Sequence, residues 1–233
     1  ELVFRGAARQ VHLAHDVPDP DALAGVAWYQ SFRCFKGNQI TVGLDYQHIY
    51  GHAWYVNKET KEVVLTPKRK MQSTDTHANE WAGYVDFRQE IANILTLDAA
   101  IRYDHHSVAG GEWVPQAGLV LRPIPTGQIK AMISRGFRNP TTKEMYLYGT
   151  ANHDSLRAES MMNYELSWHQ RLLGGRLSYD VTAFIAQGDN MIQTIAGKNV
   201  NSGTFSNKGV ELDLKWQISD SWMLITNHSY LHM

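Results

Sequence analysis

Polar and apolar residues alternate at every second position over several long stretches of the chain. Between positions 210 and 218, Val, Leu, Leu, Trp and Ile alternate with Glu, Asp, Lys and Gln. Successive side chains of a β-strand point to opposite faces, so such a strand has one apolar and one polar face. The same alternation runs through 40–47, 95–103, 163–169 and 177–185. No long segment shows the 3.6-residue period of an amphipathic helix, and the pattern therefore predicts an all-β protein.

Two kinds of link connect the predicted strands. Short links rich in turn-forming residues are expected near 36–38, 90–93, 124–127, 173–175 and 219–221. Longer polar links are expected at 14–21, 51–76, 105–113, 138–160 and 188–203. The two kinds alternate along the chain, and alternate links of an up-and-down sheet lie at opposite ends. The sequence therefore predicts short turns at one rim and long loops at the other, as in outer-membrane β-barrels.

Strand length and aromatic residues support a transmembrane barrel. The predicted strands have about ten residues or more, enough to cross a bilayer at a tilt, whereas strands of soluble proteins average about five or six. Membrane interfaces favour Trp and Tyr, and aromatic residues gather toward both predicted rims. They are Phe35, Trp216 and Trp222 at the short-turn rim, and Tyr46, Tyr50, Trp54, Tyr103 and Trp113 at the long-loop rim. The alternative, a soluble β-sandwich or lipocalin-like barrel, would bury its apolar face instead.

Strand count and composition add further limits. The pattern gives about 11 strands, whereas a closed single-chain bacterial barrel has an even number, so we expect a partial barrel without its final strands. The N-terminus lacks an initiator Met and the features of a signal peptide, which we expect to be removed or to lie upstream. The net charge of −1 gives no overall attraction to nucleic acid. Cys34 is the single cysteine, which excludes an internal disulfide and a Cys-based zinc site.

Segment 134–146 reads Ser-Arg-Gly-Phe-Arg-Asn-Pro-Thr-Thr-Lys-Glu-Met-Tyr and resembles a signature of TonB-dependent receptors. In that family a strand ending in Ser-x-Gly-Phe-Arg-x-Pro leads into an extracellular loop with Glu-Leu-Tyr, where this chain has Glu-Met-Tyr. Segments 156–159, 163–166 and 207–212 resemble three further family motifs in the family's order, with Ala158 in place of a proline. The motif residues expected to be architectural are Gly136, Phe137, Arg138, Pro140, Glu144, Glu159, Asn163, Glu165, Gly209 and Glu211. The charged residues Arg138, Glu144, Glu159 and Glu165 are placed for ion pairs at the rim or on the lumen wall.

The resemblance implies a fold, a location and a function. It implies a barrel of about 22 strands with a plugged lumen, of which residues 1–233 form a partial barrel domain without the plug. It also implies a receptor in the outer membrane of a Gram-negative bacterium, which imports a scarce nutrient with energy coupled through TonB. A ferric siderophore is the leading cargo, with cobalamin, haem and a copper complex as alternatives. The implied partners are TonB through the absent plug, outer-membrane lipid, lipopolysaccharide and the small ligand, with neither nucleic acid nor a cofactor.

Histidine and aromatic residues of the predicted long loops are the candidate cargo-binding side chains. Imidazole binds iron and copper, and aromatic side chains suit a bulky conjugated ligand. The candidates are Tyr50, His52, Trp54, His105, His106, Tyr146, Tyr148 and His153. Their spacing fits no compact metal motif, so no metal site is predicted, and polar loop residues or interfacial anchors remain the alternative reading.

Two other functions fit a barrel in this membrane. The first is a passive, porin-like channel without a plug, and the second is an outer-membrane barrel enzyme. Segment 104–107 contains the Asp, His and Ser of a hydrolytic triad. Neighbouring residues of a strand point to opposite faces, so these side chains do not form the hydrogen-bonded chain that a triad needs. The sequence therefore predicts a transporter and not an enzyme.

Overall fold

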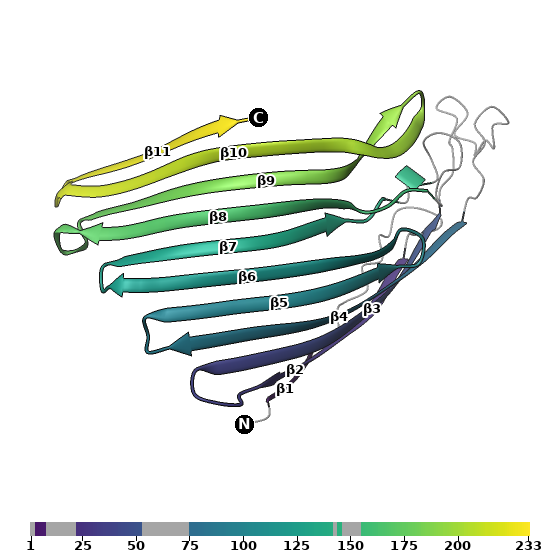
Figure 1. The fold of residues 1–233 in the computed structure, drawn as a ribbon, viewed down its shortest axis with the longest axis horizontal. Helices are drawn as coiled ribbons and strands as arrows, with labels where there is room; N and C mark the ends of the chain where they lie inside the picture. The colour runs from purple at the N-terminus through teal and green to yellow at the C-terminus, as the bar shows by residue number, and fades with distance from the viewer. Residues whose placement is uncertain (1–2, 8–21, 53–74, 142–143, 146–154) are drawn as a thin grey trace.

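The chain forms one antiparallel up-and-down β-sheet of eleven strands (Figure 1). A computed structural model describes residues 3–7, 22–52, 75–141, 144–145 and 155–233. The strands are β1 (Val3–Ala7), β2 (Ala22–Phe32), β3 (Asn38–His52), β4 (Asp75–Ile91), β5 (Leu95–His106), β6 (Gly110–Ile124), β7 (Gly127–Arg138), β8 (Glu159–Leu172), β9 (Leu177–Ile195), β10 (Lys198–Ser219) and β11 (Trp222–His232). Each strand pairs with its neighbours in sequence, which confirms the predicted fold class and strand number.

The two faces of the sheet differ in chemistry, as the alternation predicts. Leu44 on β3 lies opposite Trp28 on β2, and opposite Gly83 on β4. Residues directly opposite share a face, and on this face Leu44 is 61% exposed and Trp28 is 45% exposed. Asp45, the next residue, faces the other side and binds Arg102 on β5. The sheet thus has an apolar face that is uncovered in this chain and a polar face that carries its ion pairs.

All five predicted short turns are confirmed, and they lie at one end of the sheet, on the left in Figure 1. They occupy residues 33–37, 92–94, 125–126, 173–176 and 220–221. The fourth includes the short 3-10 segment η1 (Leu173–Gly175), in which Gly174 and Gly175 have φ of 65° and 91°. Positive φ suits glycine, which explains the Gly-Gly pair at this turn.

The prediction of long loops is wrong for two of the five links. The β5–β6 link spans only 107–109, and the β9–β10 link spans only Ala196 and Gly197. Ala196 and Gly197 have φ of 50° and 76°, and positive φ at both central residues is typical of a two-residue hairpin turn. Backbone pairing outside a membrane does not require apolar side chains, so the polar stretch 188–203 continues as hairpin. β9 has 19 residues and β10 has 22, more than the about 9–11 that cross a bilayer.

The remaining long links agree with the sequence where the structure describes their ends. β7 ends at Arg138 and β8 begins at Glu159, which matches the predicted loop 138–160. β3 extends to His52 and β4 begins at Asp75, while most of 51–76 and all of 14–21 lie outside the described residues. No helix in the described ranges is long and apolar enough to cross a membrane.

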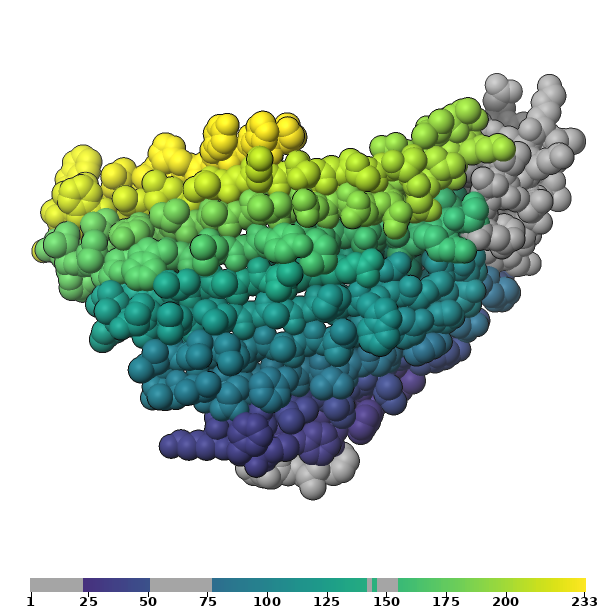
Figure 2. All heavy atoms as spheres, in the orientation of Figure 1, coloured from purple at the N-terminus to yellow at the C-terminus, as the bar shows by residue number. Residues whose placement is uncertain are grey.

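The sheet is curved and has two open edges, β1 and β11, which do not pair with each other in the described part of the chain. Figure 2 shows that side chains cover its visible face from the first strands to the last. The described residues form a single layer, and only a few apolar side chains are buried. They are Ala78, Ala82, Ala109, Met145, Leu156 and Ala158.

Candidate functional site at the long-loop rim

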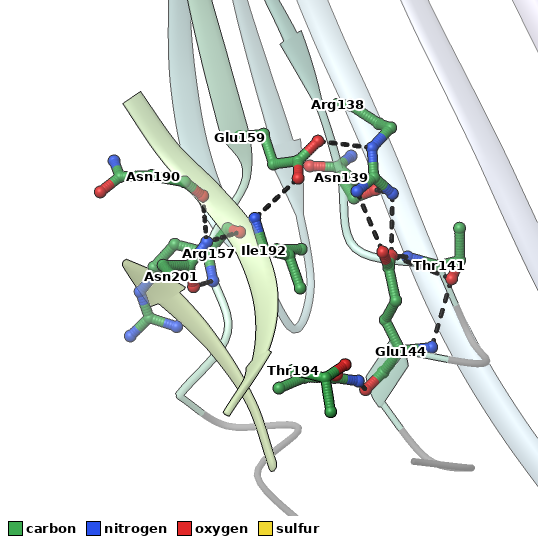
Figure 3. A network of polar contacts seen from close by, with 11 residues as sticks. Arg138, Asn139, Thr141, Glu144, Arg157, Glu159, Asn190, Ile192, Thr194 and Asn201 are labelled. Atoms are coloured by element: carbon green, nitrogen blue, oxygen red, sulfur yellow. Dashed lines mark hydrogen bonds and ion pairs between the residues drawn. The ribbon is translucent and has the colours of Figure 1, made fainter. Parts of the chain in front are cut away.

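Four residues form a charged cluster where β7 ends and β8 begins. This rim cluster consists of Arg138, Thr141, Glu144 and Glu159 (Figure 3). Arg138 Nε donates to Glu159 Oε2 at 2.7 Å, and Arg138 and Glu159 are opposite each other in the strand register. Both terminal nitrogens of Arg138 donate to the Glu144 carboxylate, at 2.8 and 3.0 Å. This two-pronged contact is the strong geometry for arginine and carboxylate, so the cluster fixes Arg138 in place.

Glu144 also closes a short turn at the base of the loop. The Thr141 backbone N–H and hydroxyl donate to Glu144 Oε2 at 2.7 and 3.0 Å, and the Glu144 N–H donates to the Thr141 hydroxyl at 3.2 Å. This reciprocal pattern is a capping box, which satisfies backbone donors at the start of a helical turn. Hydrogen bonds from Arg138 hold the pKa of Glu144 at about 2, so the carboxylate is charged at neutral pH.

The rim cluster is joined to the β9–β10 hairpin. Glu159 Oε1 accepts a hydrogen bond of 2.7 Å from the Ile192 backbone N–H on β9. Asn199 Nδ2 on β10 donates to the Glu144 backbone oxygen at 2.7 Å, and Asn199 Oδ1 accepts from the Thr194 hydroxyl at 2.8 Å. Glu159 and Asn199 are buried, and buried polar groups are stabilising only when they are paired, as these are.

The start of the loop between β7 and β8 also contacts β4, through Asn139. Asn139 Nδ2 donates to Glu80 Oε1 at 2.7 Å, and Gln47 Nε2 on β3 donates to Glu80 Oε2 at 3.3 Å. His106 Nε2 lies 3.8 Å from Glu80 Oε1. Together with the rim cluster, these contacts form a polar belt that extends from β3 to β10 at the long-loop end of the polar face.

A second ion network lies below the belt on the polar face. Arg102 on β5 donates to Asp45 on β3 at 2.6 Å and to Asp104 at 2.7 Å. Its guanidinium also lies 5.5 Å from the centre of the Tyr84 ring on β4. Asp45, Arg102 and Asp104 line a recess of about 360 Å³ together with other residues of β2, β3 and β4. The polar face therefore carries fixed charges around a recess.

The family model described as "TonB dependent receptor-like, beta-barrel" matches residues 9–232. The chain belongs to the TonB-dependent receptor β-barrel family. Its apolar face accordingly meets the lipid of the bacterial outer membrane, and its polar face lines the barrel interior. The long-loop end is the extracellular end and the short-turn end is the periplasmic end.

Relatives and solved structures agree with this family. The iron-regulated outer membrane virulence protein of Vibrio cholerae is 26% identical over 187 residues, which cover 69% of this chain and 28% of that protein. The siderophore receptor PirA of Pseudomonas aeruginosa superimposes with a TM-score of 0.75 at 21% identity, over 93% of this chain and 42% of PirA. A variant of the ferric enterobactin receptor PfeA from the same organism gives a TM-score of 0.71 at 17% identity, over 91% of this chain and 36% of PfeA. The two solved structures are named as receptors, and this chain spans 28% to 42% of the length of these three proteins.

Adjacent histidines of the receptor barrel, both predicted to bind cargo, lie on opposite faces. The His105 ring is 5.3 Å from Trp81 on the lipid-facing side. His106 faces the interior, is 3% exposed, and its Nδ1 accepts hydrogen bonds from the N–H groups of Val108 and Ala109 at 3.1 and 3.0 Å. His106 thus closes the tight β5–β6 link, and the structure does not bring the two imidazoles together.

The other predicted cargo residues are described only in part. The Tyr50 ring lies 5.0 Å from the His77 ring, and His52 pairs through its backbone with Asp75. Trp54, Tyr146, Tyr148 and His153 lie outside the described residues, and a cargo-binding role for the whole set stays a prediction. No group of three His, Cys, Asp or Glu residues in the described part of the chain is arranged to hold a metal ion.

The charged motif residues differ in whether they form the expected ion pairs. The expected ion pairs of Arg138, Glu144 and Glu159 are present. The ion pair expected at Glu165 is absent among the described residues, because its cross-strand neighbours are Met132 and Phe184.

The motif glycines and the remaining motif residues also have different surroundings. A Cβ on Gly209 would lie 2.8 Å from the Phe184 ring, whereas a Cβ on Gly136 would meet nothing within 4 Å. Pro140 is buried at the loop base, and Asn163 and Phe137 lie opposite Ser134 and Ser160. Glu211 accepts a long hydrogen bond of 3.5 Å from Ser229.

Several belt residues are not predicted from the sequence, among them Asn139, Glu80 and Asn199. Asn139 occupies the variable position of the Gly-Phe-Arg-x-Pro motif, where a short polar side chain before proline is the one available signal. Glu80 and Asn199 have no local signal, because their partners are brought close only by the pairing of strands far apart in sequence.

Proposed function

We propose that this chain is part of an outer-membrane receptor that imports a ferric siderophore with energy supplied through TonB. The family match over residues 9–232 is the observation that carries the proposal. The Vibrio cholerae relative is named for its iron regulation, and the similar structures include a siderophore receptor and a ferric enterobactin receptor. Because the chain spans 28% of that relative, transport is proposed for the whole receptor and not for this piece alone.

In this proposal the polar belt sets the shape of the extracellular opening. Arg138 and Glu159 join β7 to β8, and Asn139 and Asn199 fix the same loop to β4 and β10. Preorganised loops lower the entropy that a bound ligand must remove, which favours affinity. Cargo would then bind to the loops that this belt supports, among which Tyr146, Tyr148 and His153 are the predicted contacts.

The proposed partners follow from the same reasoning. TonB would act through a plug domain of the full-length receptor, and the small ligand would arrive from the extracellular side. A strain that lacks its own siderophore receptors and carries the full-length gene tests this. We expect uptake of iron from a ferric siderophore in that strain, and loss of uptake when TonB is also deleted.

Controls separate the alternatives. Haem, cobalamin and copper chelates supplied one at a time show whether the cargo is something other than a siderophore. Uptake that persists without TonB, or steady ion conduction by the purified receptor in planar bilayers, would favour a passive channel instead. Tyr146→Ala and His153→Ala should weaken cargo binding, whereas Tyr164→Ala, on the lipid-facing side of β8, should not.

A further inference from the structure

Polar side chains occupy the lipid-facing side just beyond its extracellular aromatic band. In that band Tyr46 on β3 lies opposite Trp81 on β4, which lies opposite His105 on β5. One pair further toward the loops, His48 lies opposite Asn79, and the pair beyond is Tyr50 with His77. His48, His77 and Asn79 are called the imidazole patch below.

Hydrogen bonds fix the patch to the aromatic band. Asn79 Oδ1 accepts from the Tyr46 hydroxyl at 2.9 Å and lies 2.8 Å from His48 Nδ1. An amide oxygen only accepts, so His48 Nδ1 carries a hydrogen in this arrangement. The Asn79 side-chain NH₂ has no hydrogen-bond partner among the described residues, and Asn79 is exposed. The patch therefore presents to the outside of the barrel two donor groups that are unused within the described ranges, the Asn79 NH₂ and the ring N–H of His77, since the single N–H of neutral His48 is already donated to Asn79.

The backbone at Asn79 is held as well. The Ser107 N–H donates to the Asn79 backbone oxygen at 2.9 Å, and the Asn79 N–H donates to the Ser107 hydroxyl at 3.0 Å. The His48 and His77 rings lie 5.9 Å apart. Donors on a rigid backbone bind a fixed acceptor better than donors on a mobile loop, because less freedom is lost.

The level of the patch matches that of lipid headgroups. Two residues advance about 7 Å along a strand, or about 5 Å along the membrane normal at a tilt of about 45°. The headgroup layer on each side of a bilayer is about 5–7 Å thick, and interfacial Trp and Tyr mark its inner boundary. His48 and Asn79, one pair beyond Tyr46 and Trp81, therefore fall within this layer, and His77, two pairs beyond at about 10 Å, lies at its outer side.

No described carboxylate side chain lies next to the patch on this face. Among carboxylates with described side chains, the two nearest in sequence are Asp45 and Glu80, which are on the interior face, where Arg102 and Asn139 bind them. Below the patch, Leu44 is 61% exposed and Val26 is 60% exposed, so acyl chains can lie directly beneath the donors.

We propose that the imidazole patch binds a phosphate group of lipopolysaccharide in the outer leaflet. Phosphate oxygens accept hydrogen bonds from amide N–H and imidazole N–H groups, and the acyl chains of the same lipid would cover Leu44, Val26 and Trp81. This inference rests on the outer-membrane location of the barrel and is independent of the cargo.

Asn79→Asp tests the proposal with little change in shape. The substitution keeps an acceptor for Tyr46 and His48 but replaces the donating NH₂ by a carboxylate oxygen that repels phosphate. We expect the full-length, delipidated receptor with this change to bind lipid A carrying both phosphates about tenfold more weakly than wild type. For dephosphorylated lipid A, both proteins should bind equally weakly.

A matched control uses a histidine on the other face. His169 lies on the interior side at the periplasmic end, where its Nδ1 is 2.9 Å from Asp180. His169→Asn should leave lipid A binding unchanged, whereas His77→Ala should weaken it about threefold even if Asn79→Asp prevents folding. Equal binding of phosphorylated lipid A by wild type and both patch variants, or equal binding of the two lipid A forms by wild type, would overturn the proposal.

Discussion

Asn139 Nδ2 donates a hydrogen bond of 2.7 Å to Glu80 Oε1, although the two residues are 59 positions apart in sequence. In the sheet their strands, β4 and β7, are separated by β5 and β6, which a link of only three residues joins at this rim. Glu80 also accepts from Gln47, so one carboxylate receives donors from the strand before it and from the loop after β7. The position of that loop therefore depends on a residue of β4.

Removing the Asn139 amide should destabilise this end of the barrel. Asn139→Ala leaves Glu80 Oε1 without its short hydrogen bond, and bonds to charged groups contribute about 1.5–3 kcal/mol. Because Glu80 is partly exposed, we expect a loss of about 1 kcal/mol in the free energy of unfolding, measured by denaturant titration. Asn227→Ala is a suitable control, since the Asn227 side chain makes no hydrogen bond within the described ranges. A similar loss for both variants would contradict a specific role for Asn139.

The sheet could be predicted from the sequence because its pattern is local. The alternation in 210–218 places Val210 and Trp216 on one face whatever the rest of the chain does, and the glycines of 173–175 mark a turn by their own backbone freedom. The same local reasoning wrongly lengthened the links at 105–113 and 188–203. Polar residues there look like loop, yet they continue as paired strands outside the membrane.

The belt could be predicted only in part. Arg138, Glu144 and Glu159 stand out because they belong to a family motif, and their ion pairs are found. Glu80 and Asn199 do not stand out in the sequence. A single carboxylate or amide in a polar strand carries no local pattern from which its hydrogen-bond partner can be predicted. Contacts across several strands depend on register and curvature, which the spacing of residues along one strand does not determine.

His106 should act through the fold and not through direct contact with cargo. His106→Leu removes the acceptor for two backbone N–H groups, those of Val108 and Ala109. Leaving the buried Ala109 N–H unpaired costs about 1–3 kcal/mol, and the partly buried Val108 N–H costs less. His106→Asn keeps an acceptor near the same position and should lose less than half as much stability. Unfolding midpoints measured beside cargo affinity check this, and an affinity that falls in both variants at unchanged stability would show direct cargo contact.

The rim cluster should stabilise the receptor at neutral pH and lose this contribution as the pH falls toward 2. The pKa of Glu144 lies at about 2, below its ordinary value of 4.5, because Arg138 donates to the charged form. A carboxyl with a lowered pKa in the folded state stabilises the fold above its unfolded pKa, and this contribution disappears as pH falls through the folded pKa. The difference in thermal midpoint between wild type and Glu144→Gln should be constant from pH 7 to about 5 and should shrink toward pH 2. Repeating the series with Arg138→Gln in both proteins should remove most of the pH dependence.

We expect position 43 to require glycine, because the Tyr84 ring lies directly over it. Gly43 on β3 pairs directly with Tyr84 on β4, and a Cβ at this position would overlap the Tyr84 ring. Gly43→Ala therefore forces the ring away from Arg102, and overpacking of this kind costs about 1–3 kcal/mol. Tyr84→Ala in the same chain should restore most of that loss, because it removes the group that the new methyl meets.

Gly118→Ala, whose Cβ would have its nearest neighbour at 3.8 Å, is the control and should change the free energy of unfolding by less than about 0.5 kcal/mol. Denaturant titration of wild type, Gly43→Ala, Tyr84→Ala and the double variant gives the coupling between positions 43 and 84. Additive losses would show that a clash with Tyr84 is not the reason for the glycine.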